Sequence, residues 1–237
     1  PSTPSHFVEL GLEKEITHQL GDVRDIKQFK RFLDEHQPEV VFHMAAQPIV
    51  RRSFVDPLET VQTNVLGVTN ILEIARQVDY IKSLIIITSD KCYENVEWTF
   101  GYREIDAVGG EDPYSASKGA GEVIARSYMR SFFEDEKTYI TTVRAGNVIG
   151  GGDWANDRLI PDSIRAWANN DILTIRNPNA TRPWQHVLEP LSGYLHVGSE
   201  LIKRNKRCKN ESFNFGPDAS VNKTVEEVLQ EMSKSWE

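Results

Sequence analysis

The amino-acid sequence predicts an α/β fold in which a doubly wound parallel sheet is covered by helices on both faces. Two observations lead to this prediction. Residues 84–87, with the sequence LIII, are apolar at every position, which is typical of a central strand buried on both sides. Near the amino end, a strand pattern, a helix pattern and a second strand pattern follow one another, which is the order of a parallel crossover unit.

Length and composition describe an ordinary globular protein of one large or two small domains. The 237 residues can bury a sizeable core, and 39% are hydrophobic and 26% charged. No apolar run approaches the roughly 20 residues that a membrane-spanning helix needs. The net charge of -8 argues against a general nucleic-acid-binding surface. We therefore expect a cytoplasmic protein without nucleic-acid or membrane partners.

The two cysteines, Cys92 and Cys208, are too few for a disulfide framework. They also lack the spacing of metal ligands, so we expect free thiols and no bound metal. The one dense basic run, residues 203–207, is interpreted as a solvated helix end rather than a nucleic-acid-binding patch.

The first third of the chain predicts a strand, a helix and a strand. Residues 16–20 have strand character and lead into Gly-Asp-Val. A helix is predicted over 25–35 from its apolar face, and a second strand over 40–44. Asp22 has two open interpretations at this stage: its carboxylate caps the following helix, or it contacts a ligand at the strand end.

The remaining elements follow from the same patterns. A long helix is predicted over residues 56–78, with Asn64 interrupting its apolar side. The core strand comes next, followed by an irregular segment over 94–110 that holds several aromatic residues. The later elements are a helix over 114–133, a strand over 139–143, a glycine-rich loop over 148–153, a helix from 161, a turn-rich passage over 177–183, a helix over 189–203, a strand over 213–215 and a helix over 224–233.

A site is predicted where the apolar central strand ends. Ser89, Asp90 and Lys91 lie just beyond that strand, at the edge where open α/β sheets bind their ligands. Tyr114 and Lys118 are four residues apart, so they share one face of the next helix. A lysine cation beside a phenol lowers the pKa of the phenol, which lets the tyrosine accept a proton nearer neutral pH. The spacing alone is a weak pattern, and a half-exposed helix face is its alternative.

Four motifs give the chain its resemblance to a known family. They are TSDKCYEN at 88–95, YSASK at 114–118, GGGDWANDRLIPD at 150–162 and RPWQHV at 182–187. Together they resemble the extended short-chain dehydrogenases/reductases, and within these the nucleotide-sugar 4,6-dehydratases. The first and third motifs are most similar to the branch that acts on CDP-glucose. The resemblance covers essentially the whole chain. It implies a Rossmann-like dinucleotide-binding domain over 1–150 and part of a smaller nucleotide-sugar-binding region over 151–237, interleaved with it.

The resemblance also assigns ligands and residues. It implies NAD as cofactor, CDP-glucose or a related nucleotide sugar as substrate, and a homodimer formed through the helices that contain Asn64 and Tyr114. The implied cofactor-binding residues are Asp22, Val23, Ala45, Ala46, Gln47, Asn64, Tyr114 and Lys118, of which Asp22 and Val23 would hold the adenine ring. The implied substrate-binding residues are Asn147, Asn156, Arg158, Leu159 and Arg182. From the residues alone, Asn64 could instead be a core amide satisfied by the backbone, and Arg182 a surface arginine.

By the same resemblance, the catalytic residues are Ser89, Asp90, Lys91, Tyr114 and Lys118. Tyr114 would take the proton of the C4 hydroxyl while Ser89 binds the same oxygen. Asp90 is the candidate acid for the leaving C6 hydroxyl. Lys91 would take part in the elimination, either as the C5 base or by stabilising the enolate. The dTDP-glucose enzymes have a glutamate at that position. The alternatives are a 4-epimerase or reductase of the same superfamily, which has no use for an Asp-Lys pair, or a non-catalytic nucleotide-sugar-binding protein.

One part of the family pattern is not found in this sequence. Family members open with a strand, a G-x-x-G-x-x-G turn and a helix, and the triple glycine at 150–152 lacks that spacing. Aligning through Asp22 and Val23 places the missing unit before Pro1. We therefore expect the sequence to be part of a longer protein, continuing at both ends. The residue that separates NAD from NADP would then precede Pro1.

Overall fold

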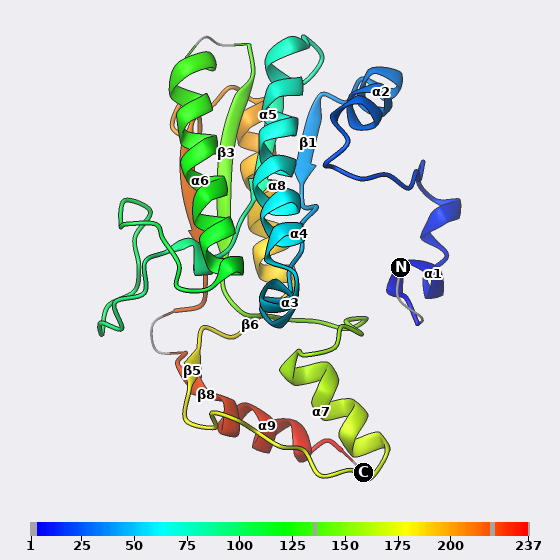
Figure 1. The fold of residues 1–237 in the computed structure, drawn as a ribbon, viewed down its shortest axis with the longest axis vertical. Helices are drawn as coiled ribbons and strands as arrows, with labels where there is room; N and C mark the ends of the chain where they lie inside the picture. The colour runs from blue at the N-terminus through cyan, green and yellow to red at the C-terminus, as the bar shows by residue number, and fades with distance from the viewer. Residues whose placement is uncertain (1–3, 135–136, 219–220, 237) are drawn as a thin grey trace. The chain divides into compact units, whose positions relative to one another are not determined.

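A computed structural model describes residues 4–134, 137–218 and 221–236 of the chain (Figure 1). The chain divides into two compact units. The sheet unit comprises Gly21–Ala145 and Glu189–Phe215, and the second unit comprises Pro1–Leu20, Gly146–Leu188 and Gly216–Glu237. Residues 189–215 supply a helix and a strand to the sheet unit, and the expected division into two interleaved regions at residue 150 stays a prediction.

The sheet unit is built on four parallel strands in the order β1-β2-β3-β7. The strands are β1 (Val40–His43), β2 (Ser83–Ile87), β3 (Tyr139–Ala145) and β7 (Glu211–Phe215). Leu84, Ile85 and Ile86 of β2 are fully buried. β2 is therefore an inner strand with a neighbour on each side, as its apolar sequence predicts.

Helices cover both faces of this sheet, which confirms the predicted doubly wound α/β class. The helices are α2 (Ile26–His36), α5 (Gly67–Gln77), α6 (Pro113–Phe132) and α8 (Leu188–Ile202). Leu84 and Ile86 of β2 pack in one core with residues of α2, α5 and α6. Ile85, which points the other way, packs with Val197 and Leu201 of α8. Figure 1 shows α5 and α6 side by side on their face of the sheet.

The long helix predicted over residues 56–78 consists of three successive pieces. Short α3 (Val50–Val55) precedes it, α4 (Pro57–Val61) begins it, and η2 (Gln62–Leu66) is a π-helical turn that leads into α5. The wider turn of η2 contains the buried Asn64. Single π turns within regular helices are frequent at functional sites.

One prediction about the first part of the chain is wrong, and one of the two interpretations of Asp22 is excluded. Residues 16–20 are not a strand: they follow α1 (His6–Glu9) and η1 (Leu12–Lys14) as irregular chain. A strand needs a neighbour for its N–H and C=O groups, and no strand of the described chain pairs with them. Nor does Asp22 cap α2. The cap is Asp25, whose carboxylate accepts hydrogen bonds from two backbone N–H groups at 3.0 and 3.1 Å.

The second unit contains short strands and, besides α1 and η1, two further helices. The helices are α7 (Leu159–Ala168) and α9 (Val225–Ser233), and the strand pairs are β4 (Val148–Ile149) with β6 (Gln185–His186) and β5 (Thr181–Arg182) with β8 (Lys223–Thr224). Thr224 caps α9 through a capping box with Glu227. No helix among the described residues is long and apolar enough to cross a membrane.

Candidate active site

A single tight turn follows the carboxyl end of β2. This turn, η3 (Asp90–Cys92), is capped by Ser89. The Ser89 hydroxyl accepts a hydrogen bond from Lys91 N–H at 3.2 Å and donates one to Asp90 Oδ1 at 2.9 Å. Within the described part of the chain, the Lys91 ammonium has no hydrogen bond or ion pair. The three polar residues predicted at the strand end therefore lie together, with a free cation among them.

Helix α6 brings Tyr114 and Lys118 to this turn. Asp112 caps the helix by accepting hydrogen bonds from the N–H groups of Tyr114 and Ser115, both at 3.0 Å. Tyr114 and Lys118 are each 7% exposed, and Lys118 Nζ lies 6.0 Å from the centre of the Tyr114 ring. Because α6 packs directly on η3, this tyrosine-lysine pair belongs to the same corner of the sheet unit as Ser89.

The Lys118 side chain is buried, and its ammonium lies over the Tyr114 ring without a hydrogen bond or ion pair to any described residue. Burial lowers its pKa to about 8, because leaving water penalises the charged form, while Cys92 and Glu122 act in the opposite direction. No described residue forms a hydrogen bond with its Nζ. A buried cation requires hydrogen-bond acceptors, so this position suits a ligand that brings hydroxyl or phosphate oxygens.

Asn64 connects the loop after β1 with α6. Its Oδ1 accepts a hydrogen bond from Gln47 N–H at 2.8 Å, and its Nδ2 donates to Gln47 O at 3.1 Å and to Ser117 Oγ at 2.8 Å. Ser117 directly precedes Lys118 on α6. Asn64 is thus satisfied within the protein, as the core-amide interpretation expects, and its contact with a cofactor stays a prediction. Ala46 is half-buried and Ala45 exposed in the same loop.

The residues expected to hold the adenine ring lie at the start of the sheet unit. Asp22 forms an exposed ion pair with Arg24, with Nη2 and Oδ2 2.6 Å apart. This hydrogen bond holds the pKa of the Asp22 carboxyl below its usual value. The carbonyl of Val23 accepts a hydrogen bond from Asn70 Nδ2 at 2.8 Å. The geometry fixes the backbone here, and adenine contact stays a prediction.

The predicted substrate residues lie in the second unit. Arg158 is the N-cap residue of α7, with its Nη1 3.5 Å from Asp153 Oδ2, while its Nε is buried and has no partner among the described residues. Leu159 begins α7, and Asn156 is exposed. The carbonyl of Asn147 accepts a hydrogen bond from Gln185 N–H at 3.0 Å. Arg182 lies on β5 and donates to the adjacent Thr181 carbonyl at 2.7 Å.

Sequence reasoning missed two buried groups near this corner. Glu122 lies on α6, four residues after Lys118, and is 1% exposed. It pairs with the equally buried Arg144. The available signal was an acidic residue on the buried face of a helix. His43, at the end of β1, is 4% exposed, and its Nε2 has no hydrogen-bond partner among the described residues. Burial lowers its pKa to about 4, with a smaller contribution from Lys118.

The cysteines and the acidic residues provide no metal centre among the described residues. No group of three or more His, Cys, Asp or Glu side chains there could hold a metal ion. Both cysteines are free thiols. Burial raises the pKa of Cys92 to about 12, so this thiol stays protonated and packs as a small apolar side chain.

Sequence comparisons relate the chain to sugar-nucleotide dehydratases. A family profile described as GDP-mannose 4,6 dehydratase matches residues 5–237. The chain is 48% identical over 241 residues to the CDP-glucose 4,6-dehydratase of Salmonella typhimurium, covering all of this chain and 67% of the relative. It is 33% identical over 178 residues to the dTDP-glucose 4,6-dehydratase of Xanthomonas campestris, covering 70% of this chain and 49% of the relative.

Solved structures with the same fold include more than one kind of enzyme. The dTDP-glucose 4,6-dehydratase of Streptomyces venezuelae, with NAD bound, matches with a TM-score of 0.76 at 21% identity over 91% of this chain and 62% of that chain. The UDP-glucose 4-epimerase of Thermotoga maritima matches with a TM-score of 0.74 at 21% identity over 92% of this chain and 68% of that chain. At this identity the likeness concerns the fold alone. The chain spans from about half to about two thirds of the length of these four relatives.

Proposed function

Since this chain belongs to the GDP-mannose 4,6 dehydratase family, we propose that the protein converts CDP-glucose to CDP-4-keto-6-deoxyglucose with loss of water. The observation that carries the proposal is the packing of α6, with Tyr114 and Lys118, against the turn that follows Ser89. The 48% identity to a CDP-glucose 4,6-dehydratase supports the choice of CDP-glucose.

NAD is the proposed cofactor of this reaction. When bound, it would accept the hydride of C4 and return it to C6. The residues present fit such a group, because the Lys118 ammonium is buried and no described residue accepts its hydrogen bonds. Its three N–H donors suit the hydroxyl groups of a ribose. The choice of NAD over NADP follows from the family.

The side chains of the sheet unit have distinct proposed tasks. Tyr114 removes the proton of the C4 hydroxyl, and the neighbouring Lys118 cation stabilises the resulting phenolate. Ser89 holds the same substrate oxygen by a hydrogen bond. Once C4 is a ketone, the C5 proton becomes acidic. Lys91 then removes that proton or stabilises the enolate, while Asp90 protonates the C6 hydroxyl as it leaves.

The second unit supplies the proposed nucleotide-sugar contacts. Asn147, Asn156, Leu159 and Arg182 are candidates from the family resemblance. Arg158 has further support, because its buried Nε lacks a partner among the described residues and a guanidinium binds phosphate oxygens in a fork. An anionic ligand at this position would satisfy that donor.

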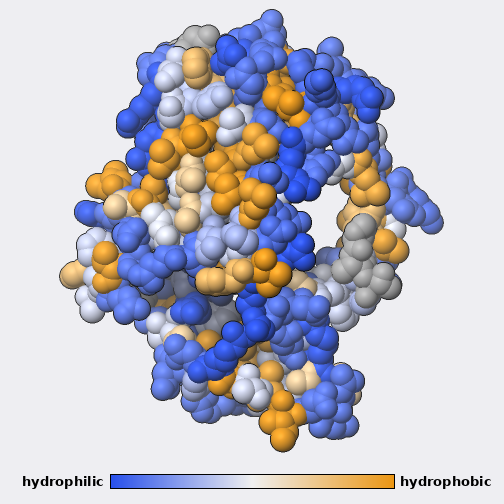
Figure 2. Space-filling model, in the orientation of Figure 1, coloured by the Kyte–Doolittle hydropathy of each residue, from blue (hydrophilic) through white to orange (hydrophobic). Residues whose placement is uncertain are grey.

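We also propose that two copies of the protein associate through α3, α4, η2 and α6. These elements adjoin one another and carry large exposed apolar side chains, namely Phe54, Val55, Leu58, Val61, Leu66 and Val123. Figure 2 shows hydrophobic residues gathered over this region of the sheet unit. Isolated exposed apolar residues are common, but a contiguous group favours an interface. Cytoplasmic localisation stays a prediction.

A sugar-nucleotide 4-epimerase is the second candidate. The shared fold does not separate the two, because a UDP-glucose 4-epimerase matches the chain as well as a dehydratase does. An epimerase needs Ser89, Tyr114 and Lys118 but no acid and amine beside them. The Asp90-Lys91 pair in η3 therefore favours dehydration. A non-catalytic nucleotide-sugar-binding protein would need none of these groups.

The proposal is tested by incubating the protein with NAD and a panel of CDP-, dTDP-, UDP- and GDP-hexoses, and weighing the products by mass spectrometry. We expect loss of one water from CDP-glucose and from no other member of the panel. A product of unchanged mass but altered configuration at C4 would favour the epimerase. Binding of a nucleotide sugar without any conversion would favour the non-catalytic alternative.

A further inference from the structure

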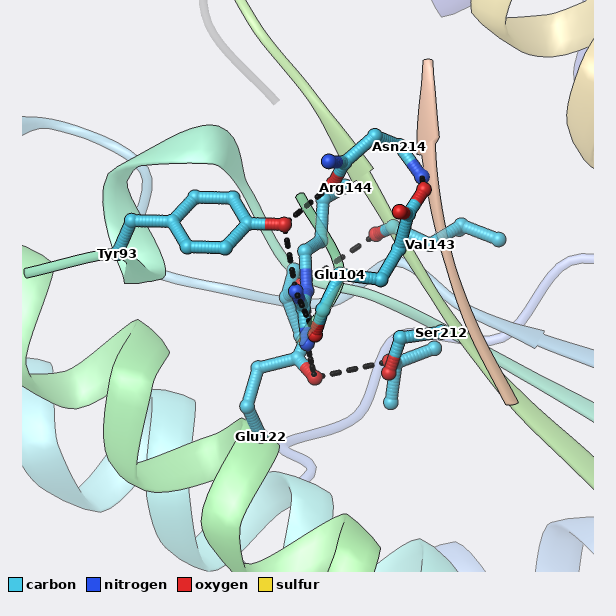
Figure 3. A network of polar contacts seen from close by, with 9 residues as sticks. Tyr93, Glu104, Glu122, Val143, Arg144, Ser212 and Asn214 are labelled. Atoms are coloured by element: carbon cyan, nitrogen blue, oxygen red, sulfur yellow. Dashed lines mark hydrogen bonds and ion pairs between the residues drawn. The ribbon is translucent and has the colours of Figure 1, made fainter. Parts of the chain in front are cut away.

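A buried ion pair lies behind the turn that carries Ser89, Asp90 and Lys91 (Figure 3). The side chains of Glu122 on α6 and Arg144 on β3 are 1% and 0% exposed. Arg144 donates to both carboxylate oxygens of Glu122, at 2.7 Å from Nη2 and 2.9 Å from Nε. Burial is the largest single influence and would raise the pKa of Glu122 and lower that of Arg144. Their mutual hydrogen bonds and charge attraction, with smaller contributions from neighbouring residues, together outweigh it, so the pKa of Glu122 is lowered and that of Arg144 is raised. The two groups therefore remain charged and fixed to each other.

Both ends of the catalytic turn are attached to this ion pair. Thr88, the residue before Ser89, donates from Oγ1 to Glu122 Oε1 at 2.5 Å. Tyr93, the residue after Cys92, accepts at its hydroxyl from Arg144 Nη1 at 2.6 Å and donates to Asn214 Oδ1 at 2.7 Å. Residues 89–92 are thus held between two side chains that bind the same buried pair.

The same ion pair is part of the helix that carries Tyr114 and Lys118. Glu122 lies about one helical turn after Lys118 on α6. A Cβ atom at Gly119 would lie 2.6 Å from Gly109 O and 3.3 Å from Cys92 O, so the helix backbone presses directly against the turn and its neighbouring loop. A shift of Glu122 relative to Thr88 or Tyr93 would therefore separate the Ser89–Lys91 turn from Tyr114 and Lys118.

We propose that Thr88, Tyr93 and the Glu122–Arg144 pair are positioning residues that hold the Ser89–Lys91 turn in register with Tyr114 and Lys118. For its catalytic meaning this inference rests on the dehydratase function proposed above. Tyr93 anchors the end of the turn nearest Lys91, and Thr88 anchors the end nearest Ser89. Loosening the Tyr93 end therefore displaces the groups assigned to elimination more than the group assigned to C4 oxidation.

Hydrogen-deuterium exchange tests the attachment without any substrate. Tyr93→Phe removes the hydroxyl that binds Arg144, and Tyr102→Phe is its control. Within the described part of the chain, the hydroxyl of Tyr102 forms hydrogen bonds only with Asn95 and Val96 of its own loop, although its ring stacks on Tyr93. In a peptide covering residues 88–93, we expect exchange about tenfold faster in Tyr93→Phe than in the wild type and unchanged in Tyr102→Phe. An exchange rate of this peptide in Tyr93→Phe equal to that of the wild type would overturn the inference.

A second matched pair decides the question if Tyr93→Phe folds poorly. Thr88→Val and Thr142→Val each remove a hydroxyl that donates to Glu122, at 2.5 and 2.8 Å. Only Thr88 adjoins the turn, whereas Thr142 lies within β3. Faster exchange of the turn in Thr88→Val alone supports a positioning role. Equal exchange rates of the turn in the two variants would show that the ion pair only stabilises the fold in general, and would overturn the proposal.

Kinetics with CDP-glucose and NAD then examine which step depends on Tyr93. We expect Tyr93→Phe to slow water loss by up to about 100-fold, with KM within about threefold of the wild type. Reduced cofactor should accumulate, because oxidation at C4 is then faster than the elimination. Equal slowing of both steps would contradict the assignment of Tyr93 to the elimination end. A wild-type protein that dehydrates no nucleotide sugar would refute the proposed function, and the exchange results would then decide the positioning role alone.

Discussion

Lys118 is held in an environment that disfavours its own charge. Burial lowers its pKa from 10.5 to about 8, and each unit of pKa shift corresponds to about 1.4 kcal/mol. Near pH 7 the lysine is protonated in both the folded and the unfolded chain, so the folded state bears the full cost of desolvation. Between about pH 8 and pH 10.5 the unfolded chain binds more protons, and stability should rise with pH.

The first prediction follows from that cost. Replacing Lys118 with methionine removes the buried charge and keeps most of the side-chain volume. We expect the free energy of unfolding near pH 7 to rise by about 1 to 3 kcal/mol, and dehydratase activity to be lost. Urea unfolding of the protein without ligands, at about pH 7 and about pH 10, provides the measurement. The gain should shrink at the higher pH, and a gain that is equal at both pH values would refute the buried-charge explanation.

Lys91, like Lys118, has no hydrogen bond or ion pair to a described residue, but its side chain is only half-buried. We predict that Lys91→Met slows formation of the dehydrated product at least about 100-fold, because no group remains to act at C5. Oxidation at C4 should persist, which absorbance of the reduced cofactor and product mass measure separately. The exposed Lys27 provides the control, since Lys27→Met leaves η3 untouched. Unchanged turnover in Lys91→Met would exclude this lysine from the elimination.

At the scale of elements, sequence patterns predicted those parts of the fold that depend on local burial. The strand at β2 could be predicted from four consecutive apolar residues, and α9 was predicted over residues 224–233, close to its observed bounds. Residues 16–20 could not be judged in this way, because a strand exists only where another strand accepts its hydrogen bonds. Asp22 and Asp25 are equally plausible caps from sequence, and only the backbone geometry selects Asp25.

The candidate site was predictable to a similar degree. Ser89, Asp90, Lys91, Tyr114 and Lys118 follow from position and spacing, together with the family resemblance. The Glu122–Arg144 pair does not, because its two residues are 22 positions apart in the chain and meet only through the packing of α6 on β3. The π turn at Asn64 was hidden because a single polar residue on the apolar side of a helix does not by itself indicate a wider turn.

The contact between α6 and the loop around Gly109 leads to a prediction with an internal control. A Cβ at Gly119 would lie 2.6 Å from a backbone oxygen, whereas the nearest atoms to a Cβ at Gly121 are 3.8 Å away. We expect Gly119→Ala to lower the free energy of unfolding by about 1 to 3 kcal/mol. Gly121→Ala should raise it by up to about 1 kcal/mol through helix propensity. Chemical denaturation compares the two, and equal effects would contradict the close packing of α6 on this loop.

At the scale of the whole molecule, the sheet unit carries one group of exposed apolar side chains on its helices. Leu58 on α4 and Val123 on α6 are 65% and 55% exposed, although the two helices pack against each other. These helices also hold Asn64 in place and position Tyr114. Association through this surface would therefore stiffen the same helices that carry the candidate site.

The last prediction concerns this surface. In a symmetric dimer each substitution occurs twice, and losing the burial of one leucine costs about 1.5 to 3 kcal/mol. We expect Leu58→Lys to weaken self-association by about 100-fold or more, and Val123→Lys to act in the same direction. Ile172→Lys is the control, because Ile172 is 95% exposed and belongs to the second unit rather than to the helices of this surface. Sedimentation velocity over a concentration series measures the effect. If the wild type sediments as a monomer at every concentration, or if Ile172→Lys weakens association as much as Leu58→Lys does, then this surface is not the interface.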